Sequence, residues 1–214
     1  MTPAHLVSLP SVSLLVVAAL HEEVRYVDSD VEVLVTGVGK AMAASGLAAR
    51  LGSVSAPRPS LVVNVGTAGA LAPAMSGVYD VDVVTQHDFP YAAIEALLGT
   101  GVGAGVGAGA PRAFALRSDG PPAAVESVPG GCVLGTGDCF VSDGAAATAL
   151  AARGIHLVDM EAYGYATACA AFGVPLRCVK AVSDRADADA AESWLDMVDA
   201  CAVALAERVR ALRR

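Results

Sequence analysis

Aromatic and charged residues are both scarce in this chain of 214 residues. Phe, Trp and Tyr together make up 5% of it, and Asp, Glu, Lys and Arg make up 17%. At 55% apolar residues the composition excludes an intrinsically disordered chain, which combines low hydrophobicity with high net charge. The length suffices to bury a sizeable core and predicts a single domain over residues 1–214.

Positive charge is also in short supply, because 14 Lys and Arg residues stand against 22 Asp and Glu. The net charge of −8 argues against nucleic acid and anionic membranes as partners. No apolar run reaches the roughly 18 residues that cross a bilayer. The stretch SVSLLVVAAL (11–20) is similar to the apolar part of a signal peptide. Since no Lys or Arg precedes it and acids follow at once, a buried first strand is expected instead.

Cysteine is too sparse and too scattered for a disulfide framework. The cysteines contain no C-x-x-C pair, are odd in number, and stand at positions 132, 139, 169, 178 and 201. Reduced thiols in a cytoplasmic protein are therefore expected. The histidines show no metal-ligand spacing with Cys or acids, so a zinc site is not expected. No other metal and no organic cofactor is expected either.

Short β-rich runs alternate with Ala-rich helical runs along the chain. Strands are predicted at 12–19, 31–36, 60–66, 78–85, 132–135, 155–158 and 175–182. Helices are predicted at 40–51, 144–153, 161–172 and 192–212. This alternation indicates an α/β layer fold with a largely buried sheet.

One segment, 99–131, is rich in Gly, Ala and Pro and is predicted to be a flexible excursion from the domain. It contains a G-x-G-x-x-A string, but without the preceding strand and following helix of a dinucleotide site. The fragment TGVGKA (36–41) lacks the first Gly of a P-loop. Ala41 also stands where a Ser or Thr would hold magnesium, so a strand-to-helix turn is predicted there.

Four predicted strands end in residues that could meet a ligand, since ligands of open α/β sheets collect at the carboxyl ends of the strands. Glu23 follows the first strand, and the run Gly66–Gly69 is expected to form a turn that presents backbone N–H groups to a ligand oxygen. Met160–Glu161 and Ser183–Asp184 follow two later strands. Each feature also has a plain structural explanation, namely acids at helix N-termini, a tight glycine turn, and an N-cap.

Seven segments together resemble the nucleoside phosphorylase and nucleosidase superfamily. They are AALHEEV, TGVGKAMAA, VVNVGTAGAL, GDCFV, VDMEAYGYA, VPLRCVKAVSD and ESWLDMV, in the order found in that family. The branch most resembled hydrolyses 5′-methylthioadenosine and S-adenosylhomocysteine. The resemblance implies a three-layer nucleoside phosphorylase-like fold, in which helices flank a central mixed, mostly buried sheet.

The resemblance also implies a reaction, the cleavage of the N-glycosidic bond between a purine and a ribose. Asp184 matches the family acid that protonates N7 of the purine, and Ser183 is expected to orient it. Glu23 matches the glutamate that activates the attacking water. Glu161 matches the acid that accepts hydrogen bonds from the ribose 2′- and 3′-hydroxyls. Asp159 has no family role and is expected to face solvent.

Further substrate contacts follow from the resemblance. Met160 is expected to pack against the sugar, Phe140 to stack on the base, and Val141 to offer backbone groups to the purine edge. Trp194 matches an aromatic residue of the 5′-substituent pocket, and Lys180 an arginine that supports the water site. Apart from the resemblance, a Phe after a Gly-Asp turn is more often a core residue, and the Trp is explained equally well as an anchor of an amphipathic helix.

Thr67, Ala68 and Gly69 are expected among the substrate-binding residues as well. His21 stands where well-known hydrolases of the family carry an acid, and neither its role nor that of His87 follows from the sequence.

The nucleophile is expected to be water rather than phosphate. Phosphorylases of the family hold phosphate with an arginine where this chain has Asn64, and acids at the end of the first strand repel phosphate. The alternatives to a methylthioadenosine/adenosylhomocysteine nucleosidase are a hydrolase of futalosine or another purine nucleoside, then a phosphorylase, and last a non-catalytic nucleoside-binding protein. A purine nucleoside is thus the expected partner, with a homodimer or higher homo-oligomer.

Overall fold

The computed structural model describes residues 13–72, 74–98, 112–116, 120–125 and 131–214. The strands are β1 (Leu14–Ala18), β2 (Glu32–Val35), β3 (Leu61–Ala70), β4 (Val78–Asp80), β5 (Val83–Gln86), β6 (Ala113–Ala115), β7 (Ala123–Val125), β8 (Val133–Thr136), β9 (Leu157–Asp159) and β10 (Leu176–Asp184). The helices are the 3-10 turn η1 (Glu22–Val24), α1 (Lys40–Leu51), α2 (Tyr91–Leu98), α3 (Gly144–Ala151), α4 (Ala162–Phe172) and α5 (Ala190–Leu212). None of the helices in these ranges combines the length and apolarity needed to cross a membrane.

All the described strands belong to one mixed sheet in the order β2-β1-β3-β9-β8-β5-β6-β7. Strand β10 pairs with β3, and β4 pairs with β10. The pairings of β3 with β1 and β10 are parallel, whereas its pairing with β9 is antiparallel. The predicted architecture, a mixed and mostly buried sheet between helices, is therefore confirmed.

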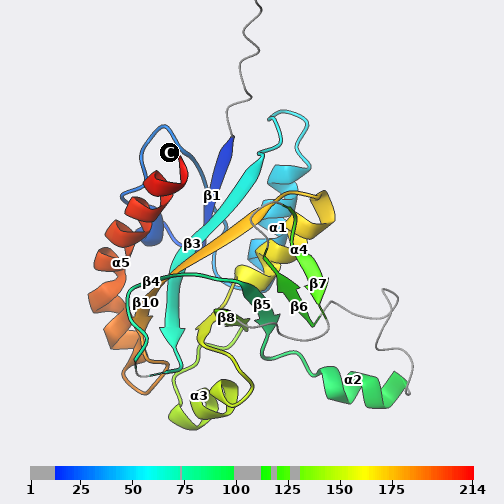
Figure 1. Ribbon diagram of the computed structural model, residues 1–214, viewed down its shortest axis with the longest axis vertical. Coiled ribbons are helices and arrows are strands. Elements are labelled where there is room, and N and C mark those ends of the chain that lie inside the picture. The colour runs from blue at the N-terminus through cyan, green and yellow to red at the C-terminus, as the bar shows by residue number, and fades with distance from the viewer. Residues whose placement is uncertain (1–12, 73, 99–111, 117–119, 126–130) are drawn as a thin grey trace, which may run out of the picture.

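The helices cover the two faces of the sheet because apolar residues alternate along the central strands. In β1, Leu15 and Val17 belong to a core with α1 and α4, whereas Val16 and Ala18 belong to a core with α5. Figure 1 shows the same division, with α5 along one side of the sheet and α1 and α4 on the other. Each fully buried Leu or Val side chain contributes about 1.5–3 kcal/mol to stability.

The sheet divides beside the middle of β3. Strand β10 follows one edge of β3 from Val62 to Gly69. On the other edge the pairing with β1 ends at Asn64, and the pairing with β9 begins only at Gly69. The intervening residues of β3 therefore have no described strand beside them on that edge, which leaves an opening at the centre of the sheet.

Helices α1 and α4 cross at unusually close range. Gly164 lies in α4, and a Cβ atom added to it would stand 2.5 Å from the backbone oxygen of Lys40 and 3.0 Å from the Cβ of Ala43. Helix α4, with the sequence AYGYATACAAF, supplies small side chains that permit this approach. Close packing of this kind leaves no room for a methyl group, since the nearest atom belongs to backbone.

The prediction of a turn at Gly66–Gly69 was wrong, because β3 continues through these residues to Ala70. The glycines suggested a break, yet pairing with β10 on one edge holds the segment extended. The predicted strand 78–85 is likewise two strands. Its chain changes partner where Val81 donates to the oxygen of Cys178 and Asp82 donates to the oxygen of Cys132.

The predicted flexible excursion, 99–131, falls largely on 99–111, 117–119 and 126–130, which lie outside the described residues. Its described part forms the short strands β6 and β7, which were not predicted and which extend the sheet beyond β5. Helix α2 was not predicted either.

Gly164→Ala should destabilise the protein by about 1–3 kcal/mol, because the added methyl group meets the backbone of α1. The higher helix propensity of Ala offsets only part of this loss. Thermal or urea unfolding measures the effect. Gly144→Ala is the matched control, since an added Cβ there has no neighbour within 4 Å and should leave stability unchanged or slightly raised. Equal unfolding midpoints for both variants would contradict the close α1–α4 contact.

Candidate active site

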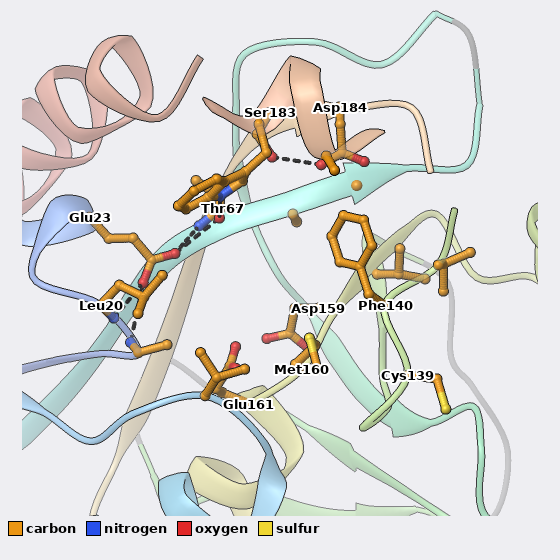
Figure 2. A pocket seen from close by; sticks show the side chains of 18 of the residues that line it. Leu20, Glu23, Thr67, Cys139, Phe140, Asp159, Met160, Glu161, Ser183 and Asp184 are labelled. Carbon is orange, nitrogen blue, oxygen red and sulfur yellow. Dashed lines mark hydrogen bonds between the residues drawn. The ribbon is translucent and has the colours of Figure 1, made fainter. Parts of the chain in front are cut away.

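A cavity of about 450 Å³ lies at the division of the sheet. Its lining comes from segments far apart in the chain and comprises Ala19, Leu20, Glu23, Val38, Thr67, Ala68, Gly69, Cys139, Phe140, Val141, Val158, Asp159, Met160, Glu161, Ser183, Asp184, Ala191, Trp194 and Leu195. Figure 2 shows the side chains of Glu23, Glu161 and Asp184 around this one space. The structure thus brings together all the predicted site residues except Lys180.

Glu23 stands at the edge of β3 that lacks a neighbouring strand. One carboxylate oxygen accepts hydrogen bonds from the backbone N–H of Thr67 at 2.8 Å and from its hydroxyl at 3.0 Å. The other accepts from the N–H groups of Ala19 and Leu20 at 3.2 and 3.1 Å. The carboxylate therefore satisfies backbone groups that the missing strand leaves unpaired, and it is 5% exposed. Glu22, by contrast, is exposed.

Asp184 ends β10 on the opposite side of the cavity. One of its oxygens accepts from the hydroxyl of Ser183 at 2.8 Å, and the other accepts from the N–H of Ala186 at 2.9 Å. A Cβ atom on Gly69 would lie 2.8 Å from the latter oxygen, so only glycine leaves room for this carboxyl group. The expected contact between Ser183 and Asp184 is present.

Glu161 occupies the N-cap position of α4 but makes no capping hydrogen bond. Its side chain turns instead toward α1, where one oxygen accepts from the N–H of Gly39 at 2.9 Å. Burial raises the pKa of Glu161 to about 7, and the nearby negative charge of Asp159 adds to the rise. A carboxyl group that titrates near neutrality can bind either as an acid or as a charged acceptor.

The prediction that Asp159 faces solvent was wrong, because Asp159 forms a buried ion pair with Lys180 at 2.9 Å. Its carboxylate also accepts from the hydroxyl of Thr136 at 2.6 Å and from the N–H of Ala162, the first residue of α4, at 2.9 Å. This accounts for the missing cap on α4, since Asp159 takes the place that Glu161 would otherwise fill.

Lys180, whose support of the water site stays a prediction, does not itself line the cavity. It is 1% exposed and lies beneath the lining. Burial alone would lower the pKa of Lys180, but the Asp159 carboxylate together with Cys178, Glu161 and Glu23 outweighs burial and holds the pKa above its usual value. A Cβ on Gly66 would lie 3.0 Å from the Lys180 amine and 3.1 Å from the Glu23 carboxylate, so these two groups approach the site's strand from the same side.

The wider wall of the cavity is apolar. Phe140 is 49% exposed, so it is a lining residue and not a core residue. Trp194 lies in the first turns of α5 and donates its indole N–H to the hydroxyl of Thr67 at 3.0 Å. Two further lining residues, Val38 and Leu195, were not singled out from the sequence. Their only signal was their place inside the TGVGKAMAA and ESWLDMV segments.

Lys40 connects α1 to the loop 137–143, which contains Phe140 and joins β8 to α3. Its amine pairs with Asp88 at 2.5 Å, and its backbone N–H donates to Asp138 at 2.9 Å. His87 lies beside this group, outside the lining, with its ring against Gly137, and burial lowers its pKa. The structure thus gives His87 a packing position near the cavity.

The cavity is strongly one-sided in charge. Glu23, Asp159, Glu161 and Asp184 line it, whereas no Lys or Arg among the described residues does. Of these four acids only Asp159 has a cation within 4 Å among the residues that the structure describes. The arrangement therefore suits a ligand that is neutral or that gains positive charge during reaction.

The pKa of Glu161 makes stability depend on pH in a defined direction. The folded protein holds the Glu161 proton up to about pH 7, whereas the unfolded chain releases it near pH 4.5, so stability falls as pH rises between these values. Glu161→Gln removes this loss and still offers an oxygen to Gly39. Below pH 4.5 the variant and the wild type should have similar free energies of unfolding. As pH rises, the variant should become the more stable of the two, by up to roughly 3 kcal/mol above pH 7. Unfolding curves at several pH values measure it, and a pH-independent difference would contradict the raised pKa.

Comparisons with known proteins agree with this geometry. The family model of the phosphorylase superfamily matches residues 22–214. A 5′-methylthioadenosine/S-adenosylhomocysteine nucleosidase of Marinomonas sp. is 30% identical over 79% of this chain and 74% of its own. The S-adenosylhomocysteine nucleosidase of Streptococcus pyogenes has a TM-score of 0.74 at 21% identity, covering 94% of this chain and 95% of its own. Futalosine hydrolase of Helicobacter pylori has a TM-score of 0.72 at 18% identity, covering 92% of this chain and 95% of its own. Sequence and fold together establish that the chain belongs to the phosphorylase superfamily.

Proposed function

We propose that this chain is a purine nucleosidase that hydrolyses the N-glycosidic bond, with a 5′-methylthioadenosine/S-adenosylhomocysteine type of substrate. The observation that carries the proposal is the meeting of Glu23, Glu161 and Asp184 in one cavity of about 450 Å³. Pockets for small ligands commonly start near 300 Å³, so a nucleoside is of suitable size. The names of the curated relatives support the same reaction.

The reaction needs an acid at the departing base. Asp184 carries a proton to N7 of the purine as the bond between C1′ and N9 breaks, and Ser183 orients the carboxyl group through their hydrogen bond. General acid catalysis of this kind is typically worth 10²–10⁴-fold. The base then leaves neutral instead of as an anion.

The sugar side needs a nucleophile and an environment for positive charge. A water adds to C1′ and passes a proton to Glu23, so that one water is consumed and the free purine and the free sugar are produced. Glu161, in its charged form, accepts hydrogen bonds from the two ribose hydroxyls and stabilises the oxocarbenium character of the transition state.

Water is favoured over phosphate as the nucleophile by the charge of the lining. Four carboxyl groups and no cation among the described residues meet the incoming group, and they repel an anion. Asn64 cannot assist phosphate either. Its amide is 1% exposed and donates to the backbone oxygens of Val17 and Val65 inside the sheet.

The apolar outer wall favours an uncharged 5′ substituent. Val38, Phe140, Trp194 and Leu195 offer carbon surface, which suits a thioalkyl group. A nucleoside with an anionic 5′ group finds no cation in the described lining. The homodimer or higher oligomer and the cytoplasmic location remain predictions from the sequence.

Glu23→Gln and Asp184→Asn should each lower kcat for 5′-methylthioadenosine by about 10²–10⁴-fold, since each removes a proton-transfer group. The rate is measured as the release of adenine, which is quantified by chromatography. Glu22→Gln is the matched control, because Glu22 is exposed and outside the cavity lining and should retain full activity. Wild-type turnover in both active-site variants would show that the assigned roles are wrong.

Turnover of 5′-methylthioadenosine should be independent of added phosphate, and adenosine 5′-monophosphate should not be cleaved at a measurable rate. Both expectations follow from the acidic lining. The measurement is adenine release from the two compounds with and without phosphate at about 10 mM, which is well above ordinary KM values of about 1 μM–1 mM. A strict phosphate requirement would identify a phosphorylase, and binding without release would identify a non-catalytic protein.

A further inference from the structure

The chain contains a single tryptophan, and its indole is part of the cavity wall. Trp194 sits near the start of α5, where its neighbour Leu195 is 68% exposed. The indole N–H donates to the hydroxyl of Thr67 at 3.0 Å. A residue expected to contact the 5′ substituent is therefore hydrogen-bonded to the central strand.

The direction of the hydrogen bonds at Thr67 is fixed by chemistry. An indole N–H can only donate, and an ionised carboxylate can only accept. The Thr67 hydroxyl therefore accepts from Trp194 and donates its one proton to Glu23, 3.0 Å away. A chain of two hydrogen bonds thus runs from the wall to the carboxylate that activates water.

The Thr67 hydroxyl is the one hydrogen-bond donor to Glu23 whose direction can change. Three of the four hydrogen-bond donors to Glu23 are backbone N–H groups, held by β3 and by the turn after β1. The fourth is the Thr67 hydroxyl, whose proton can rotate toward another acceptor. The Trp194 N–H occupies the acceptor side of that hydroxyl and so keeps its proton aimed at Glu23.

We infer that Trp194 and Thr67 are positioning residues through which a 5′ substituent raises the turnover number. The inference rests on the proposed nucleosidase function. A substituent that packs on Trp194 holds the indole in place, the indole holds the Thr67 hydroxyl, and the hydroxyl holds one oxygen of Glu23. Binding energy from a part of the substrate remote from the reacting bond then appears in kcat and not only in KM.

The rival explanation is that the same contacts merely fasten α5 to the sheet. In that case, substitutions would lower the melting temperature, or raise KM, without changing how kcat responds to the 5′ group. A comparison of two nucleosides that differ only at that group separates the two explanations.

The test uses the full chain with 5′-methylthioadenosine and 5′-deoxyadenosine. Wild type should have the higher kcat with the thioalkyl compound. Trp194→Phe keeps an aromatic ring but lacks the N–H. We expect it to lower kcat for 5′-methylthioadenosine about fivefold and kcat for 5′-deoxyadenosine by less, and so to reduce the preference for the thioalkyl compound.

Thr67→Val and Thr67→Ser form a matched pair, since only Ser keeps the hydroxyl. Val should lower kcat about tenfold or more for both nucleosides, because a hydrogen bond to a charged group is lost, and Ser should restore it. The fluorescence of the sole tryptophan gives a readout apart from activity. Its emission should shift in Thr67→Val and not in Thr67→Ser, because only Val removes the acceptor of the indole N–H.

The outcomes separate this inference from the proposed function. If wild type cleaves both nucleosides and Trp194→Phe keeps the full kcat preference for the thioalkyl compound, the coupling is overturned and the nucleosidase proposal stands. Full kcat in a folded Thr67→Val also overturns it. If wild type releases no purine from either compound, the proposed function itself fails, and the coupling fails with it.

Discussion

The buried ion pair between Asp159 and Lys180 is the interaction on which the site depends. Four carboxyl groups line one cavity, and their mutual repulsion would favour protonation or opening of the fold. A fully buried ammonium beneath them supplies the compensating charge, at 2.9 Å from Asp159. Removing one partner of such a pair leaves an uncompensated buried charge, which is strongly destabilising. Asp159 also caps α4 through Ala162, so the pair connects the electrostatics of the cavity to the start of a helix.

The division of the sheet beside β3 explains why the cavity lies where it does. A continuous strand on both edges of β3 would bury its N–H groups in the ladder and leave no opening. Glu23 fills the vacant edge by binding the N–H of Thr67, so a residue assigned to catalysis also completes the hydrogen bonding of the sheet. The conditions for a stable fold and for a positioned carboxylate are therefore met by the same contact.

Local patterns in the sequence predicted the helices better than the strands. Predicted helices 40–51, 161–172 and 192–212 differ from α1, α4 and α5 by two residues or fewer at each end, because Ala-rich periodic runs mark helices clearly. Strand β3 was cut short because Gly66 and Gly69 suggest a turn. Their real cause is the space that Glu23, Lys180 and Asp184 occupy beside them, a tertiary contact that no local pattern contains. The acids of the site were singled out by their place at predicted strand ends, and their roles were assigned through the resemblance. The partnership of Asp159 with Lys180, which are distant in sequence, could not be predicted in either way.

The tight crossing of α1 and α4 has a consequence for how the protein can diverge. Gly39 precedes α1, Glu161 precedes α4, and their hydrogen bond spans the two helix starts at 2.9 Å. Because the backbones of the two helices are in contact at Gly164, the distance between the helices sets the length of that hydrogen bond. Surface residues of either helix can therefore be exchanged freely in evolution, whereas larger residues where the helices meet would push them apart and displace the Glu161 carboxylate without contacting it.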